Sequence, residues 1–200
     1  MNTELLLPLL IGYLLGSIPF GLILTRLAGK GDVRKIGSGN IGATNVLRAG
    51  GKALAAATLI LDALKATAAV LIAELLWPGL ESNTAGVVAA AGALVGHLYP
   101  VWLKFHGGKG AATFFGLLIP LLPLAAAFYA IVWIAALLIV RISSVAGMLA
   151  AVTAPIAALA LGSSDFPVLL AFAILIVWRH HENIARLWAG TEPKIGRSRL

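Results

Sequence analysis

The chain has 200 residues, 60% of them hydrophobic, and its mean hydropathy of +0.97 predicts a polytopic membrane protein with no room for a separate soluble domain. A formal net charge of +7 would suggest nucleic acid as the partner of a soluble protein, but basic loops on one membrane face explain it here, so we expect no nucleic-acid partner. Cysteine is absent, which excludes disulfides, thiol catalysis and cysteine metal sites.

Seven apolar stretches predict transmembrane helices. The first has no basic n-region and no small-residue cleavage site, so we expect a retained span, kinked at Gly16-Ser17-Ile18-Pro19. The stretches cover residues 5–28, 53–77, 85–103, 111–122, 124–140, 143–161 and 166–179. We therefore expect an all-α polytopic membrane protein with one integral membrane domain, 1–200.

Basic residues predict the orientation, because Lys and Arg concentrate in cytoplasmic loops. With seven spans, every loop that carries Lys or Arg falls on the same face, and this face includes residues 29–52, 104–110 and 180–200. The N-terminus is therefore expected outside and the C-terminus in the cytoplasm. A single helix over 111–140 would reverse this parity, but it would be about 45 Å long, and Pro120 and Pro123 favour two spans with a tight turn.

The first cytoplasmic segment contains the longest polar, glycine-rich run of the chain, from Gly37 to Arg48. Glycine lets backbone N–H groups approach a ligand closely, and the guanidinium of Arg48 suits phosphate or carboxylate. The run predicts an anion-binding lining, with a flexible turn as the alternative. Its members are Gly37, Ser38, Gly39, Asn40, Gly42, Asn45 and Arg48, of which Asn40 and Asn45 are expected chiefly to fix the shape of the loop.

The second segment places glycines directly before the helix predicted from residue 111. Unpaired N–H groups at a helix start attract anions, and Lys109 adds a mobile cation. A Walker A loop is excluded by its spacing, and a basic helix cap is the alternative. The predicted members are Lys104, Gly107, Gly108, Lys109, Gly110 and Thr113, with His97 upstream as a structural residue.

The third segment begins at His180. His180 and Asn183 are three residues apart and therefore share a helix face, which Arg186 extends by one turn. An ordinary polar helix end at the membrane surface is the alternative. His181-Glu182 is not followed by a histidine at zinc-binding spacing, and the chain has only four histidines, so we expect no metal and no cofactor.

Two charged residues lie inside the predicted span 53–77. Asp62 and Lys65 are three residues apart and can pair, which lowers the cost of carrying either in the bilayer. We favour a structural pair over a direct role toward substrate.

The residue types restrict the chemistry. Arg48, Lys109 and Lys104 would gather near glycine N–H groups at one membrane face, which suits phosphate groups. No carboxylate pair suits acid–base catalysis and no nucleophile elbow occurs. A transferase acting on an already activated substrate fits best. The alternatives are a transporter of a phosphorylated metabolite, although the polar groups crowd one face, and a scaffold for anionic lipid headgroups.

The three motifs resemble those of the bacterial membrane glycerol-3-phosphate acyltransferases that use acyl phosphate, the PlsY family. The resemblance covers nearly the whole chain and rests on residues 37–48, on 96–113, and on His180-x-x-Asn183-Ile184-x-Arg186-Leu187 with Gly190-x-Glu192-x-Lys194. Two residues depart from the pattern, His106 in place of a lysine and Trp102 in place of a phenylalanine, and neither touches the core of a motif.

The resemblance implies transfer of a fatty acyl group from acyl phosphate to glycerol 3-phosphate. The products would be lysophosphatidate and phosphate, in the first step of phospholipid biosynthesis, on the cytoplasmic face of the bacterial inner membrane. By analogy, the catalytic residues are Ser38, Arg48, Lys109, His180 and Asn183, the glycine loops hold phosphate, and Arg186 and Glu192 are structural at the site. A monomer is expected, and contact with the enzyme that makes acyl phosphate is left open.

The proton of the acceptor hydroxyl needs a base. We favour the phosphate of the donor, because no carboxylate is well placed, and His180 is the rival because its ordinary pKa suits the task.

Overall fold

The structure, a computed structural model, describes residues 3–80 and 83–196, so the last four residues of the predicted cytoplasmic tail lie outside it. All regular elements in these ranges are helices, as predicted. The chain forms two compact units, Met1–Leu121 and Leu122–Leu200. The expectation of a single integral membrane domain stays a prediction.

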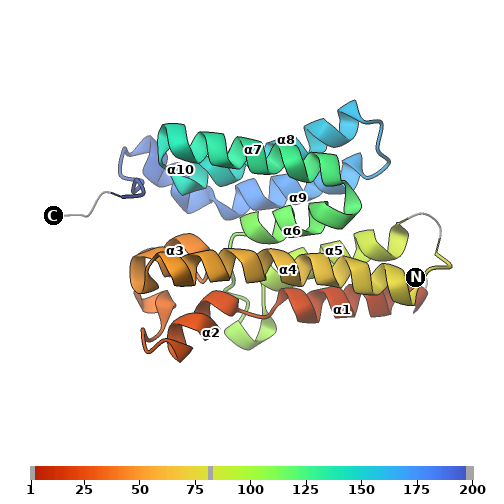
Figure 1. The fold of residues 1–200 in the computed structure, drawn as a ribbon, viewed down its shortest axis with the longest axis horizontal. Helices are drawn as coiled ribbons and strands as arrows, with labels where there is room; N and C mark the ends of the chain where they lie inside the picture. Colours follow the sequence, from red (N-terminus) through yellow and green to blue (C-terminus); the bar gives the residue numbers. More distant parts are fainter. Residues whose placement is uncertain (1–2, 81–82, 197–200) are drawn as a thin grey trace. The chain divides into compact units, whose positions relative to one another are not determined.

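The first unit is built around its longest helix, α4, which packs against α1, α5 and α6, while α1 packs chiefly against α5 (Figure 1). Its α-helices are α1 (Leu6–Gly16), α2 (Phe20–Leu27), α3 (Ala43–Gly50), α4 (Lys52–Leu76), α5 (Thr84–Leu98) and α6 (Ala111–Leu121). Short 3₁₀ turns add η1 (Thr3–Leu5), η2 (Val33–Lys35) and η3 (Val101–Leu103).

The first predicted span is broken where the kink was expected. α1 ends at Gly16 and α2 begins at Phe20, and Pro19 between them has φ −91° and ψ 70°, which is not helical. Proline has no N–H to donate and its ring restricts the backbone. The chain therefore leaves the helix at this point and exposes the carbonyl of Ile18 toward the interior of the unit, where Lys65 donates to it.

Glycines bring α1 and α5 into backbone contact. A Cβ on Gly12 or Gly16 would lie 2.1 Å from the carbonyl oxygen of Ala89 or Ala93, and a Cβ on Gly92 would lie 2.2 Å from that of Leu9. Small residues spaced by four allow such close helix packing within a membrane. The tyrosine hydroxyl of Tyr13, on α1, donates to the Tyr99 carbonyl at 2.9 Å. The C-terminal end of α5 is thereby fixed against α1.

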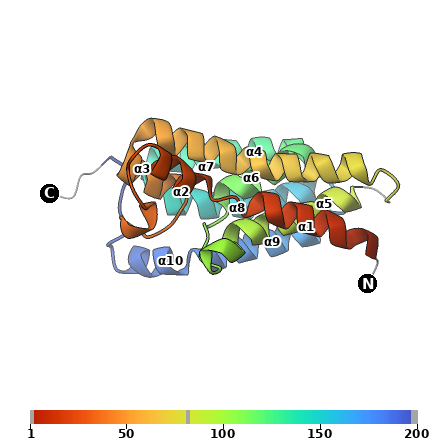
Figure 2. The ribbon, with the colours of Figure 1, turned by 90° about the horizontal axis from the view of Figure 1, so that it is seen from below.

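In the second unit, α8 packs against both α7 and α9 (Figures 1 and 2). The α-helices of this unit are α7 (Pro123–Val140), α8 (Ser143–Ala160), α9 (Phe166–Arg179) and α10 (His181–Trp188). The chain bends by 54° between α9 and α10, at His180. The bend places His180 between an apolar helix and a short polar one.

Within the part of the chain that the structure describes, four helical stretches are long and apolar enough to cross a membrane, and a fifth is counted if α9 and α10 form one bent span. The four are Leu6–Leu27, Thr84–Leu103, Pro123–Val140 and Ser143–Ala160. Helices begin and end within a few residues of all seven predicted stretches, and separate helices cover 111–121 and 123–140, as predicted. The number of seven spans and the orientation stay predictions.

Candidate active site

Asn45 fixes the loop between η2 and α3. Its buried side-chain nitrogen lies 2.8, 2.9 and 2.8 Å from the carbonyl oxygens of Val33, Ile36 and Asn40, and its Oδ1 accepts from the backbone N–H of Ser38 at 3.1 Å. One side chain therefore supplies the partners that a regular element would otherwise give to this backbone. These contacts fix the loop, as expected for Asn45, and its part in binding a substrate stays a prediction.

Asn40 and two glycines complete the loop. The Asn40 Oδ1 accepts from the Gly42 N–H at 2.9 Å, a contact within the loop as expected for Asn40, and its part in binding a substrate stays a prediction. Gly37 and Gly39 have φ of 58° and 69°, in the left-handed region that favours glycine. A Cβ on Gly37 would also lie 2.4 Å from the Asn45 Oδ1. Both the space and the backbone therefore call for glycine at Gly37.

Ser38 and Arg48 lie beside this fixed loop. Ser38 is exposed, and its backbone is tied to Asn45. Arg48 lies on α3, a helix that forms within the predicted polar loop, and its Cδ would be 3.2 Å from a Cβ on Gly37. The side chain of Arg48 therefore passes beside the glycine turn. The first unit thus brings Gly37, Ser38 and Arg48 close together.

Asp32 at the start of η2 is held by arginine. The Arg34 guanidinium is 2.6 Å from the Asp32 Oδ2, and the backbone N–H of Arg34 donates to the Asp32 Oδ1 at 3.0 Å. These hydrogen bonds hold the pKa of Asp32 well below its usual range. The carboxylate stays ionised and shapes the loop, so it is unsuited to acid–base catalysis.

The second glycine segment is bound to the C-terminal end of α5. The N–H groups of Gly107 and Gly108 donate to the carbonyls of Leu98 and His97 at 3.1 and 3.0 Å. These contacts satisfy carbonyls that a helix end leaves without partners. A Cβ on Gly108 would lie 2.0 Å from the His97 Nε2, so only glycine fits against the imidazole.

The start of α6 carries the other predicted residues of this segment. The Gly110 carbonyl accepts from the Phe114 N–H at 2.7 Å, which begins the helix directly after the loop. Lys109 is half-buried in the loop, whereas Lys104 is exposed with φ 53°. Thr113 is fully buried, and its Oγ1 has no hydrogen-bond partner among the described residues. The helix start therefore holds Lys109 and Thr113 on either side of Gly110.

An apolar cluster joins the two loop segments of the first unit. Leu22, Val33, Ile41 and Val46 are buried together, and Leu103 from η3 packs against them. The polar run around Gly37 and the turn that precedes Gly107 therefore pack against the same apolar cluster.

The third segment is organised around Glu192, in the second unit. The Glu192 Oε1 accepts from the Ser144 Oγ at 2.7 Å and from the Asn183 Nδ2 at 2.5 Å, and its Oε2 accepts from the Arg186 Nε at 2.7 Å. Burial opposes ionisation, but the hydrogen bonds from Asn183, Ser144 and Arg186 outweigh it and hold the pKa of Glu192 below its ordinary value. Glu192 thus fixes Asn183 and ties the tail to α8.

His180 is buried at the bend between α9 and α10. Its Nδ1 lies 2.7 Å from the Ile176 carbonyl oxygen. A carbonyl only accepts hydrogen bonds, so Nδ1 carries a hydrogen and, in the neutral ring, Nε2 is the basic nitrogen. Asn183 follows one turn later on α10 and is also buried. The two residues therefore lie at the same end of the second unit.

Some side-chain contacts could be predicted from the sequence and others could not. The predicted pair of Asp62 and Lys65 is confirmed, with the Lys65 Nζ 2.7 Å from the Asp62 Oδ1. The link from Lys65 to His97, at 3.0 Å, was missed, because no local pattern connects residues 32 positions apart. Ser144 was missed because a serine at a helix start usually serves the helix itself.

The predicted site residues are divided between the two units of the chain. Ser38, Arg48, Lys109 and Thr113 belong to the first unit, and His180 and Asn183 belong to the second. The contacts of all six with substrate stay predictions, as does the meeting of the three segments. Among residues 3–80 and 83–196, no group of three or more metal-ligating side chains could hold an ion.

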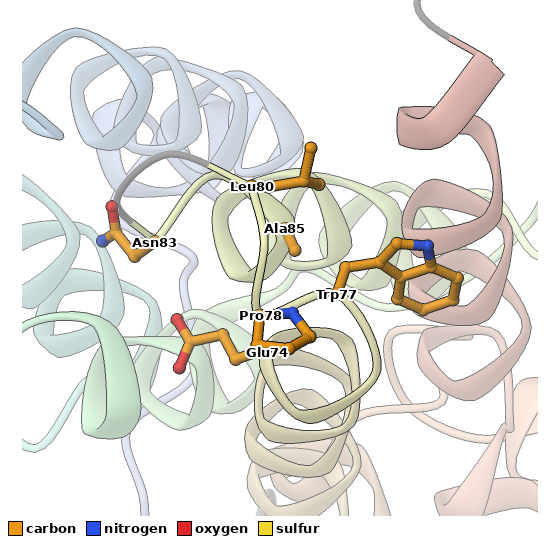
Figure 3. A pocket seen from close by; sticks show the side chains of 6 residues that line it. All are labelled: Glu74, Trp77, Pro78, Leu80, Asn83 and Ala85. Atoms are coloured by element: carbon orange, nitrogen blue, oxygen red, sulfur yellow. The ribbon is translucent and has the colours of Figure 1, made fainter.

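A small cavity lies at the opposite end of α4 from these loops. Its volume is about 280 Å³, and Glu74, Trp77, Pro78, Leu80, Asn83 and Ala85 line it (Figure 3). None of the predicted site residues contributes to it.

Two solved structures are closely similar to this fold. One is a crystal structure of PlsY (YgiH), an integral membrane glycerol 3-phosphate acyltransferase, in its glycerol 3-phosphate form, with 37% identity, a TM-score of 0.88 and coverage of 96% of each chain. The other is its lysophosphatidic acid form, with 36% identity, a TM-score of 0.86 and coverage of 96% and 95%. Together with the apolar helices, they identify an integral membrane protein of all-helical class.

A profile of the glycerol-3-phosphate acyltransferase family matches residues 6–190, and the chain belongs to this family. A glycerol-3-phosphate acyltransferase of Agrobacterium fabrum is 57% identical over 193 residues, covering 96% of this chain and 92% of the relative. That of Mesorhizobium japonicum is 57% identical over 197 residues, covering 98% of both. The family inferred from the three motifs is confirmed.

Proposed function

We propose that the protein transfers a fatty acyl group from acyl phosphate to the primary hydroxyl of glycerol 3-phosphate, giving lysophosphatidate and phosphate. Membership of the glycerol-3-phosphate acyltransferase family supports glycerol 3-phosphate as the acceptor of the acyl group. The forms in which its structural relative was solved, with glycerol 3-phosphate and with lysophosphatidic acid, support the same acceptor and product. We place the reaction on the cytoplasmic face of the bacterial inner membrane because the basic loops are predicted there.

The chemistry of the side chains in the three segments favours acyl phosphate as the donor. An acyl phosphate is a mixed anhydride with a reactive carbonyl and a good leaving group, so it needs little acid–base assistance. The enzyme must chiefly align two anions and stabilise the oxyanion. Among the carboxylates of the three segments, Asp32 is paired with Arg34, Glu192 is occupied by three donors, and Glu182 is exposed to solvent on α10. This arrangement favours a donor that arrives activated.

In the first unit, phosphate binding is assigned to the two glycine loops. The loop 107–110 leads into α6, so backbone N–H groups and the helix dipole favour an anion at Lys109. Arg48 and Ser38, beside the turn at Gly37, would bind and orient glycerol 3-phosphate. Gly39, Gly42, Asn45 and Thr113 would line the same loops, and the exposed Lys104 would attract anions.

In the second unit, roles are proposed from its own geometry. The His180 Nδ1–H donates to the Ile176 carbonyl, and we assign to the Nε2 of the same ring a contact with a hydroxyl or a phosphate of the substrates. The Asn183 amide is oriented by Glu192, and Arg186 supports that carboxylate. The expected monomer and the contact with the enzyme that makes acyl phosphate stay predictions.

The deciding experiment uses detergent-purified protein with acyl phosphate and glycerol 3-phosphate. We expect phosphate release that requires both substrates and matches lysophosphatidate formation, with no product when acyl-CoA replaces acyl phosphate. Arg48→Ala should raise the KM for glycerol 3-phosphate by about 10- to 100-fold, the effect of losing a charged hydrogen bond. Release without glycerol 3-phosphate, or product from acyl-CoA alone, would contradict the proposal.

A further inference from the structure

Three ionisable side chains meet in the interior of the first unit, beside the loop 107–110. Asp62 and Lys65 come from the middle of α4, and His97 comes from the last turn of α5. Their exposed fractions are 3%, 5% and 4%. Burying charged groups among apolar helices is costly, and apolar residues of similar size are often at least as stabilising as a buried ion pair. The cluster therefore calls for a reason beyond packing.

The surroundings of Lys65 determine which atom of His97 accepts. The Lys65 Nζ lies 2.7 Å from the Asp62 Oδ1, 2.8 Å from the Ile18 carbonyl oxygen and 3.0 Å from the His97 Nδ1. The contact with Asp62 is an ion pair, and the contacts with Ile18 and His97 are hydrogen bonds. An ammonium group has hydrogens to donate and no acceptor. The His97 Nδ1 therefore accepts, and the proton of the neutral imidazole is on Nε2.

The opposite side of the imidazole ring faces the glycine loop. A Cβ added to Gly108 would lie 2.0 Å from the His97 Nε2, so the ring lies directly against this glycine. The His97 carbonyl accepts from the N–H of Gly108 at 3.0 Å, so the ring and the backbone of His97 both hold the same residue. Lys109 follows directly. The position of the imidazole thus sets the position of the loop.

We propose that Lys65, held in place by Asp62, is a positioning residue that fixes the Nε2–H tautomer and the orientation of His97, through which it sets the loop 107–110. The loop then presents Lys109 and its backbone N–H groups in one fixed arrangement. What the loop binds rests on the proposed function. The tautomer and the clamp on Gly108 do not, so they can be tested in protein without substrate.

The first test is ¹⁵N NMR of detergent-solubilised protein labelled at histidine. The chain has four histidines, and the His97 signals are assigned by their loss in His97→Gln. We expect a protonated Nε2 and an unprotonated Nδ1 in the wild type. In Lys65→Met the ring should exchange between both tautomers. A protonated Nδ1 in the wild type, or a ring unchanged in Lys65→Met, would overturn the proposal.

The second test is kinetic. Lys65→Met should lower kcat/KM by about 10- to 100-fold, by analogy with the loss of groups that orient metal-binding histidines. The matched control is Lys52→Met at the exposed start of the same helix, which should retain wild-type activity. His97→Gln, whose amide nitrogen can take the place of Nε2, should retain more activity than His97→Asn, whose amide takes the place of Nδ1.

A third variant separates positioning from charge balance. Lys65→Met alone leaves Asp62 buried without its cation and can fail to fold. Asp62→Leu with Lys65→Met removes both charges, so it should fold with a thermal unfolding temperature near that of the wild type. It still lacks the donor to His97, and kcat/KM should stay at the level expected for Lys65→Met. Recovery of wild-type kcat/KM in the double variant would refute positioning.

The two proposals fail differently. If the wild type releases no phosphate with both substrates, the proposed function fails, while the NMR result still decides the tautomer. If the wild type is active and the double variant matches it, the inference about Lys65 fails and the proposed function stands.

Discussion

At the scale of single residues, Asn45 has the widest structural effect in the first loop. Asn45→Ala would leave the carbonyls of Val33, Ile36 and Asn40 and the N–H of Ser38 without their present partner. Each buried group left unsatisfied costs about 1–3 kcal/mol. We expect a clear fall in the thermal unfolding temperature and a raised KM for glycerol 3-phosphate.

The control for Asn45 is its neighbour Thr44, which is half-buried on the same helix. Thr44→Ala should shift the stability by no more than about 0.5 kcal/mol, as most substitutions away from special features do. Equal losses in both variants would mean that α3 as a whole, and not the asparagine side chain, holds the loop.

His180 tests where the proton of the acceptor hydroxyl goes. If the phosphate of the donor is the base, His180→Ala should lower kcat by about 10²-fold or less, the lower end for a positioned general base. His180→Gln offers an amide at the position of Nε2 and should retain more activity than His180→Ala. A loss of many orders of magnitude with glycerol 3-phosphate binding intact would instead make His180 the base. Kinetics and calorimetric binding on the same preparations separate the two.

Glu192 predicts a pH dependence of stability in the second unit. Its pKa is lowered in the folded protein, so its hydrogen bonds stabilise the fold above its ordinary pKa near 4.5 and lose that contribution as the pH falls through the folded value. Thermal unfolding of the wild type and of Glu192→Gln should differ most at neutral pH. The difference should shrink below the ordinary pKa. A difference that grows with acidification would contradict this linkage.

At the scale of elements, the contact of α1 with α5 is the feature most sensitive to side-chain size. Gly16→Ala would place a Cβ 2.1 Å from the Ala93 carbonyl oxygen. The atoms that it would meet belong to the backbone of α5, which cannot turn aside as a flexible side chain could. Overpacking of this kind costs about 1–3 kcal/mol, so we expect a lower thermal unfolding temperature. The shift would also displace the end of α5 that carries His97, and activity should fall with stability.

The matched control is Gly79→Ala, where an added Cβ meets nothing within 4 Å. It should change the unfolding temperature little. If Gly16→Ala is equally mild, the two helices can separate without cost, and their contact is not what positions His97.

Helix boundaries and loop interiors differ in how far they could be predicted. The apolar stretches were predictable because their ends are fixed by composition and by proline, as at Pro123, where α7 begins. The short helix α3 was not expected, because its eight residues follow a glycine-rich polar run and are too few for their amphipathic pattern to be told from a loop. It forms because Val46 is buried against Leu22 and Val33, from other elements. The contact between Lys65 and His97 likewise depends on tertiary packing.

At the scale of the whole molecule, the membrane topology follows from how the chain crosses between 111 and 140. The backbone leaves the helix at Leu122, with φ −151° and ψ 78°, and α7 starts at Pro123. Two crossings there give seven spans and put the loop 29–52 and the tail on one face, whereas a single crossing would put them on opposite faces. The basic residues of both segments favour the same face.

The absence of cysteine makes this topology directly testable, since every introduced thiol reports alone. Lys35→Cys in the first loop and Thr191→Cys in the tail, both exposed, should react with a membrane-impermeant maleimide only after the cells are opened. Ser164→Cys, exposed between α8 and α9, should react in intact cells. Phosphate release by each variant confirms a native fold. Labelling of Lys35→Cys and Thr191→Cys from opposite sides would require one crossing over 111–140, and it would separate the first glycine loop from His180 by the thickness of the membrane.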